Sequence, residues 1–444
     1  DQVHSDCHDV KFHPTNPDIV YVASDGGIHR SIDGGQTYQF ANGGLQNCQF
    51  YNGFSSAALD PTFCLGGLQD NGTIYRNGDN TWSVIAGGDG SWSAINPEDP
   101  STFYVSSQYL NVNRFRPDEE WQFMDIPETS GPVFIAPYVI CPSDGDIIYA
   151  GSGGMAKTID GGDSWELTNN GESLDGNPVL SIGVTLNPNV VYCATAPTTI
   201  FGGSRSNFFV TIDGGQSWQH ETGILPDRYP MDIAIDPSDA ATAYVVFSGF
   251  GTGHVYKTTD YGSNWTDISG DLPDLPTNAV IVDPIYPEHI YIGNDFGVYV
   301  STDGGLNWEA FQTGLNKATM VFDLSISPID RKLRAATHGN GAFQRDLLDN
   351  PLHAEDAGTI VQGFTVYPNP ASAQTTVSFT LAETQNIRLQ LLDSSGRLLE
   401  QKPATQYPAG INQVDWSCAD LPAGSYFIQL MGEGLTRTQQ LVIK

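Results

Sequence analysis

An eight-residue pattern, Ser/Thr-x-Asp-x-Gly-x-x-aromatic, recurs along the first 346 residues and constrains the fold more than any other feature of the chain. A pattern repeated at this spacing indicates that one supersecondary unit is copied along the chain, each copy burying its apolar faces against its neighbours. Five copies are intact, at residues 31–38, 158–165, 211–218, 258–265 and 301–308. Two further units keep only the aromatic residue: 76–82 is one residue short, and 114–121 lacks the Asp and the Gly.

A second marker, a short apolar strand ending in a residue–Pro step, precedes these units. The steps lie 36 to 49 residues apart and begin at His13, Asp60, Asn96, Cys141, Asn187, Asp236, Asp283 and Ser327. Four short strands per ~40–45 residues are the signature of a β-propeller blade. We count seven four-strand units and an eighth, 322–346, with three strands. The sequence therefore predicts an all-β chain with a seven- or eight-bladed β-propeller over 1–346, and we expect a strand from upstream of residue 1 to complete the last blade.

The repeated pattern resembles the Asp-box, or BNR repeat, of sialidases, sortilin-type propellers and xyloglucanase-type glycoside hydrolases. The resemblance covers residues 10–346 and implies an architecture rather than a chemistry. The aspartate of such a box accepts backbone N–H bonds in a tight turn, and the aromatic residue wedges between blades. We therefore assign a structural role to the box aspartates, which are Asp33, Asp160, Asp213, Asp260 and Asp303.

Charge divides the chain into two parts. The chain has 51 acids and 19 bases, a net charge of −32, but residues 363–444 carry only six acids and five bases. The first 362 residues therefore hold 45 acids and 14 bases. A shift this sharp marks a domain boundary, and we place a linker at 347–362. So acidic a surface repels phosphate backbones, which argues against nucleic-acid binding, and no apolar run is long enough to span a membrane.

Residues 363–444 alternate apolar and polar side chains with period two, which predicts a small Ig-like antiparallel β-sandwich of six or seven strands. The segment resembles the C-terminal sorting (Por) domain of type IX secretion, found in Bacteroidetes-type bacteria. The matching stretches are 364–370, Asp393 with Gly396 and Arg397, 408–410, 421–426 and 440–444. The resemblance implies secretion by that machinery to the outer-membrane surface or the medium. The alternative is a generic carbohydrate-binding or adhesive sandwich.

Six cysteines fit an exported protein without proving export. They are Cys7, Cys48, Cys64, Cys141, Cys193 and Cys418, and their spacing matches no zinc template. Cys48 and Cys64 lie close in sequence and are the pair we expect to form a disulfide. Free buried thiols are equally plausible for the other four.

Acids beside glycines mark the face of the predicted propeller opposite the Asp-boxes. They are Asp25, Asp70, Asp89 and Asp295, in the loops that follow the second or fourth strand of a unit. Glycoside hydrolysis needs two carboxyl groups across a cleft, and Asp70 and Asp89 flank neighbouring strand ends. We take these four as candidate catalytic residues. The alternatives are that they cap backbone amides in turns, or that they bind calcium.

Residues 21–30, which contain Asp25, resemble the segment that bears one catalytic acid in xyloglucanase-type enzymes. Those enzymes use two tandem propellers and draw one carboxylate from each, whereas one ring is visible here. Sialidase activity is not expected, because the chain lacks the Arg-Ile-Pro segment of that family.

Other side chains on the same face are candidate ligand-binding residues: Trp92, Tyr109 and Phe296 as sugar platforms, and His338 in a glycine-rich loop. Near the start, His4, Asp6 and His8 fall on one side of an extended strand and are candidate metal ligands, or else a hydrogen-bonded polar layer. We expect no required cofactor. The sequence favours a propeller that binds or processes extracellular polysaccharide, and the alternative is a non-catalytic, sortilin-like protein-binding scaffold or adhesin.

Overall fold

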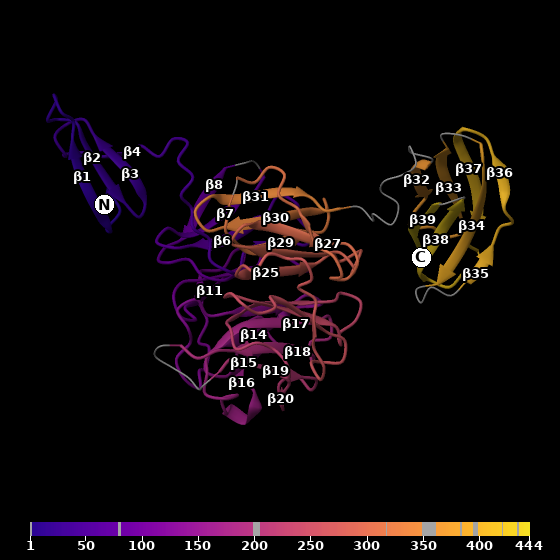
Figure 1. Cartoon of the computed structure of the whole chain (residues 1–444), viewed down its shortest axis with the longest axis horizontal. Helices are drawn as coiled ribbons and strands as arrows, with labels where there is room; N and C mark the ends of the chain where they lie inside the picture. The colour runs from indigo at the N-terminus through magenta and orange to yellow at the C-terminus, as the bar shows by residue number, and fades with distance from the viewer. Residues whose placement is uncertain are drawn as a thin grey trace. The chain divides into compact units, whose positions relative to one another are not determined.

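The computed structural model describes the chain except for residues 1, 79–80, 199–204, 317, 349–360, 382–383, 394–397, 420 and 433–434. The described residues form β-strands and one short 3₁₀ turn, Asn169–Gly171, and contain no α-helix. The chain divides into two compact units, 1–348 and 349–444 (Figure 1). Most of the predicted linker, 349–360 of 347–362, lies outside the described residues.

Seven antiparallel sheets follow one another in a closed cycle, each packing through its first strand on the first strand of the next (Figure 1). The first four sheets contain β5 (Ser55–Ser56), β6 (Cys64–Leu68), β7 (Gly72–Arg76) and β8 (Trp82–Ala86); β9 (Ser93–Ile95), β10 (Phe103–Ser106), β11 (Val112–Phe115) and β12 (Gln122–Phe123); β13 (Tyr138–Cys141), β14 (Asp144–Gly151), β15 (Met155–Thr158) and β16 (Glu166–Leu167); and β17 (Val179–Val184), β18 (Val191–Thr195), β19 (Asn207–Thr211) and β20 (Gln219–His220). The last three contain β21 (Pro230–Ile235), β22 (Ala243–Phe247), β23 (Val255–Thr258) and β24 (Thr266–Asp267); β25 (Thr277–Val282), β26 (Ile290–Asn294), β27 (Gly297–Ser301) and β28 (Glu309–Ala310); and β29 (Val321–Ser327), β30 (Lys332–Thr337) and β31 (Gly341–Asp346). The all-β propeller predicted from the repeats is confirmed.

The first sheet of the chain is not a member of this cycle. It contains β1 (Cys7–Phe12), β2 (Val20–Ser24), β3 (Gly27–Ser31) and β4 (Gln39–Phe40). Apolar side chains on its two edge strands stay exposed: Phe12 is 65% and Phe40 73% accessible. The sheet has the strand order of a blade, but it meets the ring through loop residues rather than through a packed face.

The segment between this sheet and β5 closes the ring. Gln49 bridges to His338 of the last sheet, and Phe50 bridges to Leu68 of the first sheet of the cycle. The backbone N–H of Phe50 also donates to Thr337 O at 3.0 Å. We expected a fourth strand from upstream to complete the last blade. Among the described residues that sheet has three strands, and the bridges of Gln49 and Phe50 join it to the first sheet of the cycle.

A buried carboxylate strengthens the same closure. Oδ2 of Asp323, on β29, accepts the N–H groups of Gly53 and Phe54, both at 2.6 Å, just before β5. Asp323 lines a central cavity of about 690 Å³ together with Asp232, whose Oδ2 accepts Val280 N at 2.9 Å from the neighbouring sheet. Burial, and then the charge of Asp232, raise the pKa of Asp323 above the usual carboxyl range.

The Asp-box aspartates lie in turns between the third and fourth strands, as their structural assignment requires. Asp160 accepts Ser164 N at 2.9 Å and Thr158 Oγ1 at 2.7 Å, and the hydrogen bonds that it accepts lower its pKa to about 2. The other four accept the same kinds of bond. Box tryptophans reach neighbouring sheets: Trp265 Nε1 donates to Glu221 O, and Trp308 Nε1 donates to Ile268 O, both at 2.8 Å.

The described residues of the C-terminal unit form a β-sandwich of eight strands, where six or seven were predicted. One sheet contains β32 (Val361–Tyr367), β33 (Gln374–Leu381) and β37 (Gly410–Ser417). The other contains β34 (Gln385–Asp393), β35 (Leu398–Gln401), β36 (Thr405–Tyr407), β38 (Gly424–Gly432) and β39 (Leu435–Ile443). Side chains at alternate positions, including the fully buried Phe379, Trp416 and Ile428, fill the space between the sheets. The extra strand is β36, a three-residue pairing too short to stand out in the sequence.

The predicted disulfide is not formed, because all six cysteines are free thiols. Cys48 and Cys64 belong to one apolar cluster beside the closure of the ring, and burial raises the pKa of both thiols. The two residues lie in the same cluster, as their closeness in sequence suggested, but they form no disulfide.

We predict that Asp323 makes the stability of the ring fall as pH rises above the carboxyl range. Its pKa is raised in the folded state, so folding takes up a proton between the unfolded carboxyl value of about 3.9 and the raised value, at a slope of up to about 1.4 kcal/mol per pH unit. Thermal midpoints across this range should fall for the wild type and fall less for Asp323→Asn. Parallel curves would contradict this role.

Candidate functional site

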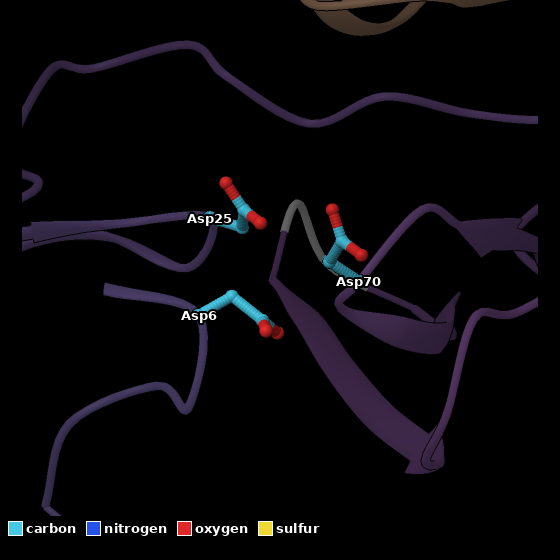
Figure 2. Close-up of side chains that lie close together, drawn as sticks. All are labelled: Asp6, Asp25 and Asp70. Atoms are coloured by element: carbon cyan, nitrogen blue, oxygen red, sulfur yellow. The ribbon is translucent and has the colours of Figure 1, made fainter. Parts of the chain in front are cut away.

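The candidate site lies where the β1–β4 sheet meets the ring. Asp70 stands in the turn between β6 and β7, with a backbone φ of 60°, a left-handed value that few residues other than glycine adopt. Asp25 occupies the corresponding turn between β2 and β3, and Asp6 lies just before β1. Figure 2 shows the three side chains converging from these separate segments. Carboxylate oxygens of all three lie within 4.8 Å of one another.

Asp89 holds the turn that carries Asp70. One carboxylate oxygen of Asp89 accepts Asp70 N at 2.6 Å, and the other accepts Gln108 Nε2 at 2.7 Å. Asp89 follows β8, so the loop after the last strand of this sheet fixes the turn between its second and third strands. Asp70 and Asp89 therefore lie close together as expected, but the contact between them is a hydrogen bond from the backbone amide of Asp70 to the carboxylate of Asp89. Asp89 acts here as a positioning residue, because its oxygens are occupied by these donors.

Two hydrogen bonds attach the sheet to this turn. His4 Nε2 lies 2.8 Å from the backbone oxygen of Asp70, and Asn71 Nδ2 donates to the backbone oxygen of Asp25 at 3.3 Å. A third bond, from Asp25 N to Asp6 O at 3.1 Å, ties the two acids of the sheet together. The bonds use backbone oxygens, which leaves the carboxyl groups of Asp25 and Asp70 facing one another.

The acids differ in their surroundings. Asp70 is half-buried, and burial, followed by the charges of Asp89 and Asp25, raises its pKa above the usual range. His8 hydrogen-bonds to Asp25 Oδ1, and this bond and the charge of Asp25 raise the pKa of His8. Burial, with the charges of Asp89 and Asp70, also raises the pKa of the nearby Tyr51 to about 12. A carboxyl group whose pKa is raised thus faces another that is hydrogen-bonded to an imidazole.

The fourth candidate acid, Asp295, does not join this cluster. Its Oδ1 accepts Asn278 Nδ2 at 3.0 Å, in the turn between β26 and β27. Phe296 beside it is exposed. His338 stacks on Phe322 with ring centroids 4.6 Å apart, at the ring closure. These residues occupy the predicted face but not the acid cluster.

The two remaining aromatic candidates have different environments. Trp92 lines the central cavity, and its backbone oxygen accepts Tyr138 Oη at 2.8 Å. Tyr109 is exposed, has a φ of 63° and meets Phe134 edge to face at 5.4 Å. It directly follows Gln108, the partner of Asp89, so Tyr109 is the aromatic candidate tied most closely to the acids.

Of the three predicted metal ligands, only Asp6 belongs to the group of acids within 4.8 Å; His4 and His8 each hydrogen-bond to another member of that group. Carboxylate oxygens at this spacing are also the ligand type that calcium takes. The sequence did not connect Asp6 to Asp70, because their contact crosses from the sheet to the ring.

Comparison with protein families identifies the C-terminal unit. Residues 365–444 match the secretion system C-terminal sorting domain. A type IX sorting domain indicates secretion to the cell surface or the extracellular space, and it implies the type IX machinery as a partner. The described residues include no helix long and apolar enough to cross a membrane.

Comparison with solved structures concerns the propeller. The chain is similar to the GH74 xyloglucanase from Xanthomonas campestris, with 15% identity and a TM-score of 0.53, covering 76% of this chain and 58% of that enzyme. It is also similar to the GH74 enzyme from Niastella koreensis, with 17% identity and a TM-score of 0.52, covering 89% of this chain and 73% of that one. At these identities the likeness shows the fold alone. No curated protein matches the chain.

We predict that Asp89→Ala destabilises the ring by about 2 kcal/mol, since hydrogen bonds to charged groups contribute roughly 1.5–3 kcal/mol. The substitution leaves Asp70 N without its acceptor in a left-handed turn. Asp295→Ala is the matched control, because it removes a single side-chain bond on the same face. Chemical denaturation should show the larger loss for Asp89→Ala, and equal losses would contradict the positioning role.

Proposed function

We propose that the protein is an exported glycoside hydrolase acting on neutral polysaccharide, with its acid pair divided between the β1–β4 sheet and the ring. The observation that carries the proposal is the facing of Asp70, whose pKa is raised, and Asp25, across the junction of the two parts. Support comes from a propeller similar in fold to xyloglucanases and from a sorting domain that indicates delivery outside the cell.

Asp70 is suited to be the general acid. Its raised pKa keeps it protonated to higher pH, so it can donate the proton to the departing glycosidic oxygen. Asp25 is suited to be the partner carboxyl group, because it lies opposite Asp70 and is held by a hydrogen bond to His8. It would activate water or attack the sugar directly. Tyr109, next to Gln108, provides an exposed ring on which a sugar can stack.

The spacing of the acids adds a requirement. Their nearest oxygens lie within 4.8 Å, while glycosidases separate their two carboxyl groups by about 5–5.5 Å or about 6.5–9.5 Å according to stereochemistry. Sugar binding must therefore widen the gap slightly. The two acids can separate because the sheet is held at this point by the hydrogen bonds of His4 and Asn71 rather than by a packed core.

We predict that purified protein releases reducing ends from one member of a neutral panel of xyloglucan, mixed-linkage glucan and arabinoxylan. Asp70→Asn should lower the rate by about 10²–10⁴-fold, the usual contribution of a general acid. Asp295→Asn is the control and should retain activity. Polysaccharide binding with no product would favour a non-catalytic binding propeller, and a fully active Asp70→Asn would remove Asp70 from the mechanism.

We also predict a bell-shaped pH–rate profile whose alkaline side reports Asp70. Activity falls there as Asp70 loses its proton. Asp89→Asn keeps an oxygen for Asp70 N but removes a neighbouring negative charge, so the pKa of Asp70 should fall and the alkaline side should move to lower pH. An unmoved or raised alkaline limit would contradict this assignment.

Calcium is expected to compete for the same acids rather than to assist them. A bound ion would take Asp25 and Asp70 as ligands and prevent proton transfer. We predict that chelator-treated protein keeps its activity and that millimolar calcium lowers it. Loss of activity on chelation, with recovery on adding calcium, would show instead that the cluster holds a required ion.

A further inference from the structure

A second pocket lies at the ring closure, at the far end of β7 from Asp70. It has a volume of about 250 Å³ between the first and last sheets of the cycle. Its walls combine three aromatic rings, two guanidinium groups and one amide, and are formed by Phe54, Cys64, Arg76, Trp82, Arg334, Ala342, Phe343 and Gln344. Asp70 comes just before β7 and Arg76 is its last residue, so the two sites are separated by the length of that strand.

Two arginines at one pocket are unusual in this ring. The first 362 residues hold only 14 bases against 45 acids. Arg334 is 2% exposed, and Arg76 is half-buried. Gln344 Oε1 accepts from both, each at 3.4 Å, and so lies between the two guanidinium groups. The pocket therefore concentrates positive charge at a point on an otherwise acidic protein.

Unlike comparable arginines, Arg334 makes no direct ion pair with a described residue, although the charge of Asp60 acts on it from farther away. Arg114 pairs with Asp163 at 2.7 Å, and Arg331 pairs with Asp283 at 2.9 Å. Within the described part of the chain, no carboxylate lies within 4 Å of the Arg334 guanidinium, whose remaining partners are the backbone oxygens of Pro61 and Phe63. A buried charge is costly unless it is paired, and carbonyl oxygens offset only part of that cost.

The aromatic walls define what kind of anion fits. Trp82 is 37% exposed, and its ring is tilted against that of Phe54 with the centroids 6.3 Å apart, so two aromatic rings line the pocket side by side. Guanidinium groups match the two oxygens of a carboxylate, and an aromatic ring stacks on a sugar or another ring. The volume suits one six-membered ring rather than an oligosaccharide.

We propose that this pocket binds a carboxylate carried on a single six-membered ring, either a sugar acid or an aromatic acid. The carboxylate would displace Gln344 Oε1 from between Arg76 and Arg334, and the ring would lie against Trp82. Because the pocket walls come from the first and last sheets, the ligand would also stabilise the closure of the ring. The proposal is independent of the acid cluster and does not rest on its activity.

Calorimetry and thermal unfolding of the full chain test the proposal with two matched pairs of probes. The pairs are benzoate with benzamide, and glucuronate with glucose, all at constant ionic strength. At least one carboxylate should bind and raise the thermal midpoint with concentration, while its neutral partner should not. The pair that responds identifies the ligand as aromatic acid or sugar acid. Absence of binding by both carboxylates, or equal binding by a neutral partner, would overturn the proposal.

Variants place the binding at this pocket. Arg76→Gln should weaken the responding carboxylate at least about tenfold, the lower end expected for a hydrogen bond to a charged group. It is preferred to Arg334→Gln, which removes bonds that join the two sheets and threatens folding. Arg345→Gln removes a charge from the same last sheet, where Arg345 stacks on Phe311 outside the pocket, and should bind normally. Equal affinity in Arg76→Gln and the wild type would place the ligand elsewhere and overturn the proposal.

Discussion

The hydrogen bond from Asp70 N to Asp89 is the interaction on which the candidate site depends. It holds Asp70 in a left-handed turn that its side chain would otherwise disfavour. The same carboxylate places a negative charge beside Asp70 and contributes to its raised pKa. One acid thus holds the turn of another and adds to the effect of burial on its pKa. Gln108 in turn fixes Asp89, which extends the network to the loop that carries Tyr109.

The site also depends on two structural elements, the ring and the β1–β4 sheet, which hold its acids in different ways. The sheets of the ring pack in a closed cycle. The bridges that Gln49 and Phe50 make, and the hydrogen bonds of Asp323, hold the first and last sheets together. The β1–β4 sheet stands outside that cycle and meets it at the acid cluster. Rigid packing fixes Asp70, while a few hydrogen bonds fix Asp25. This arrangement lets two carboxyl groups approach closely and still separate for a substrate.

The sequence was sufficient for local features and insufficient for long-range ones. The repeated box predicted the turns of Asp33 and Asp160, because every determinant lies within eight residues. Glycine-flanked Asp25 and Asp70 were identifiable as turn acids on one face. Their meeting with Asp6 was not, since it depends on how the first sheet attaches to the ring. The free Cys48 and Cys64 show the same limit, because closeness in sequence does not set side-chain direction.

The buried acids Asp323 and Asp232 were not predicted, although the sequence contained a signal for them. Asp323 sits in the apolar strand β29, and Asp232 has the matching place in β21. An acid inside an apolar strand must be hydrogen-bonded, and here each one bonds across to a neighbouring sheet. Such a pair could have been identified as blade-joining residues. The charged pocket at the closure had no comparable signal, because Arg76 and Arg334 are far apart in the sequence and meet only when the ring closes.

The most direct test of the central claim is a double-mutant cycle on hydrolysis with Asp25→Asn and Asp70→Asn. Residues that act as one catalytic pair are strongly non-additive, because removing either disables the same step. We predict that each single variant loses most of the activity and that the double variant loses little more. Independent, additive losses, or an active Asp25→Asn, would contradict a site shared between the sheet and the ring.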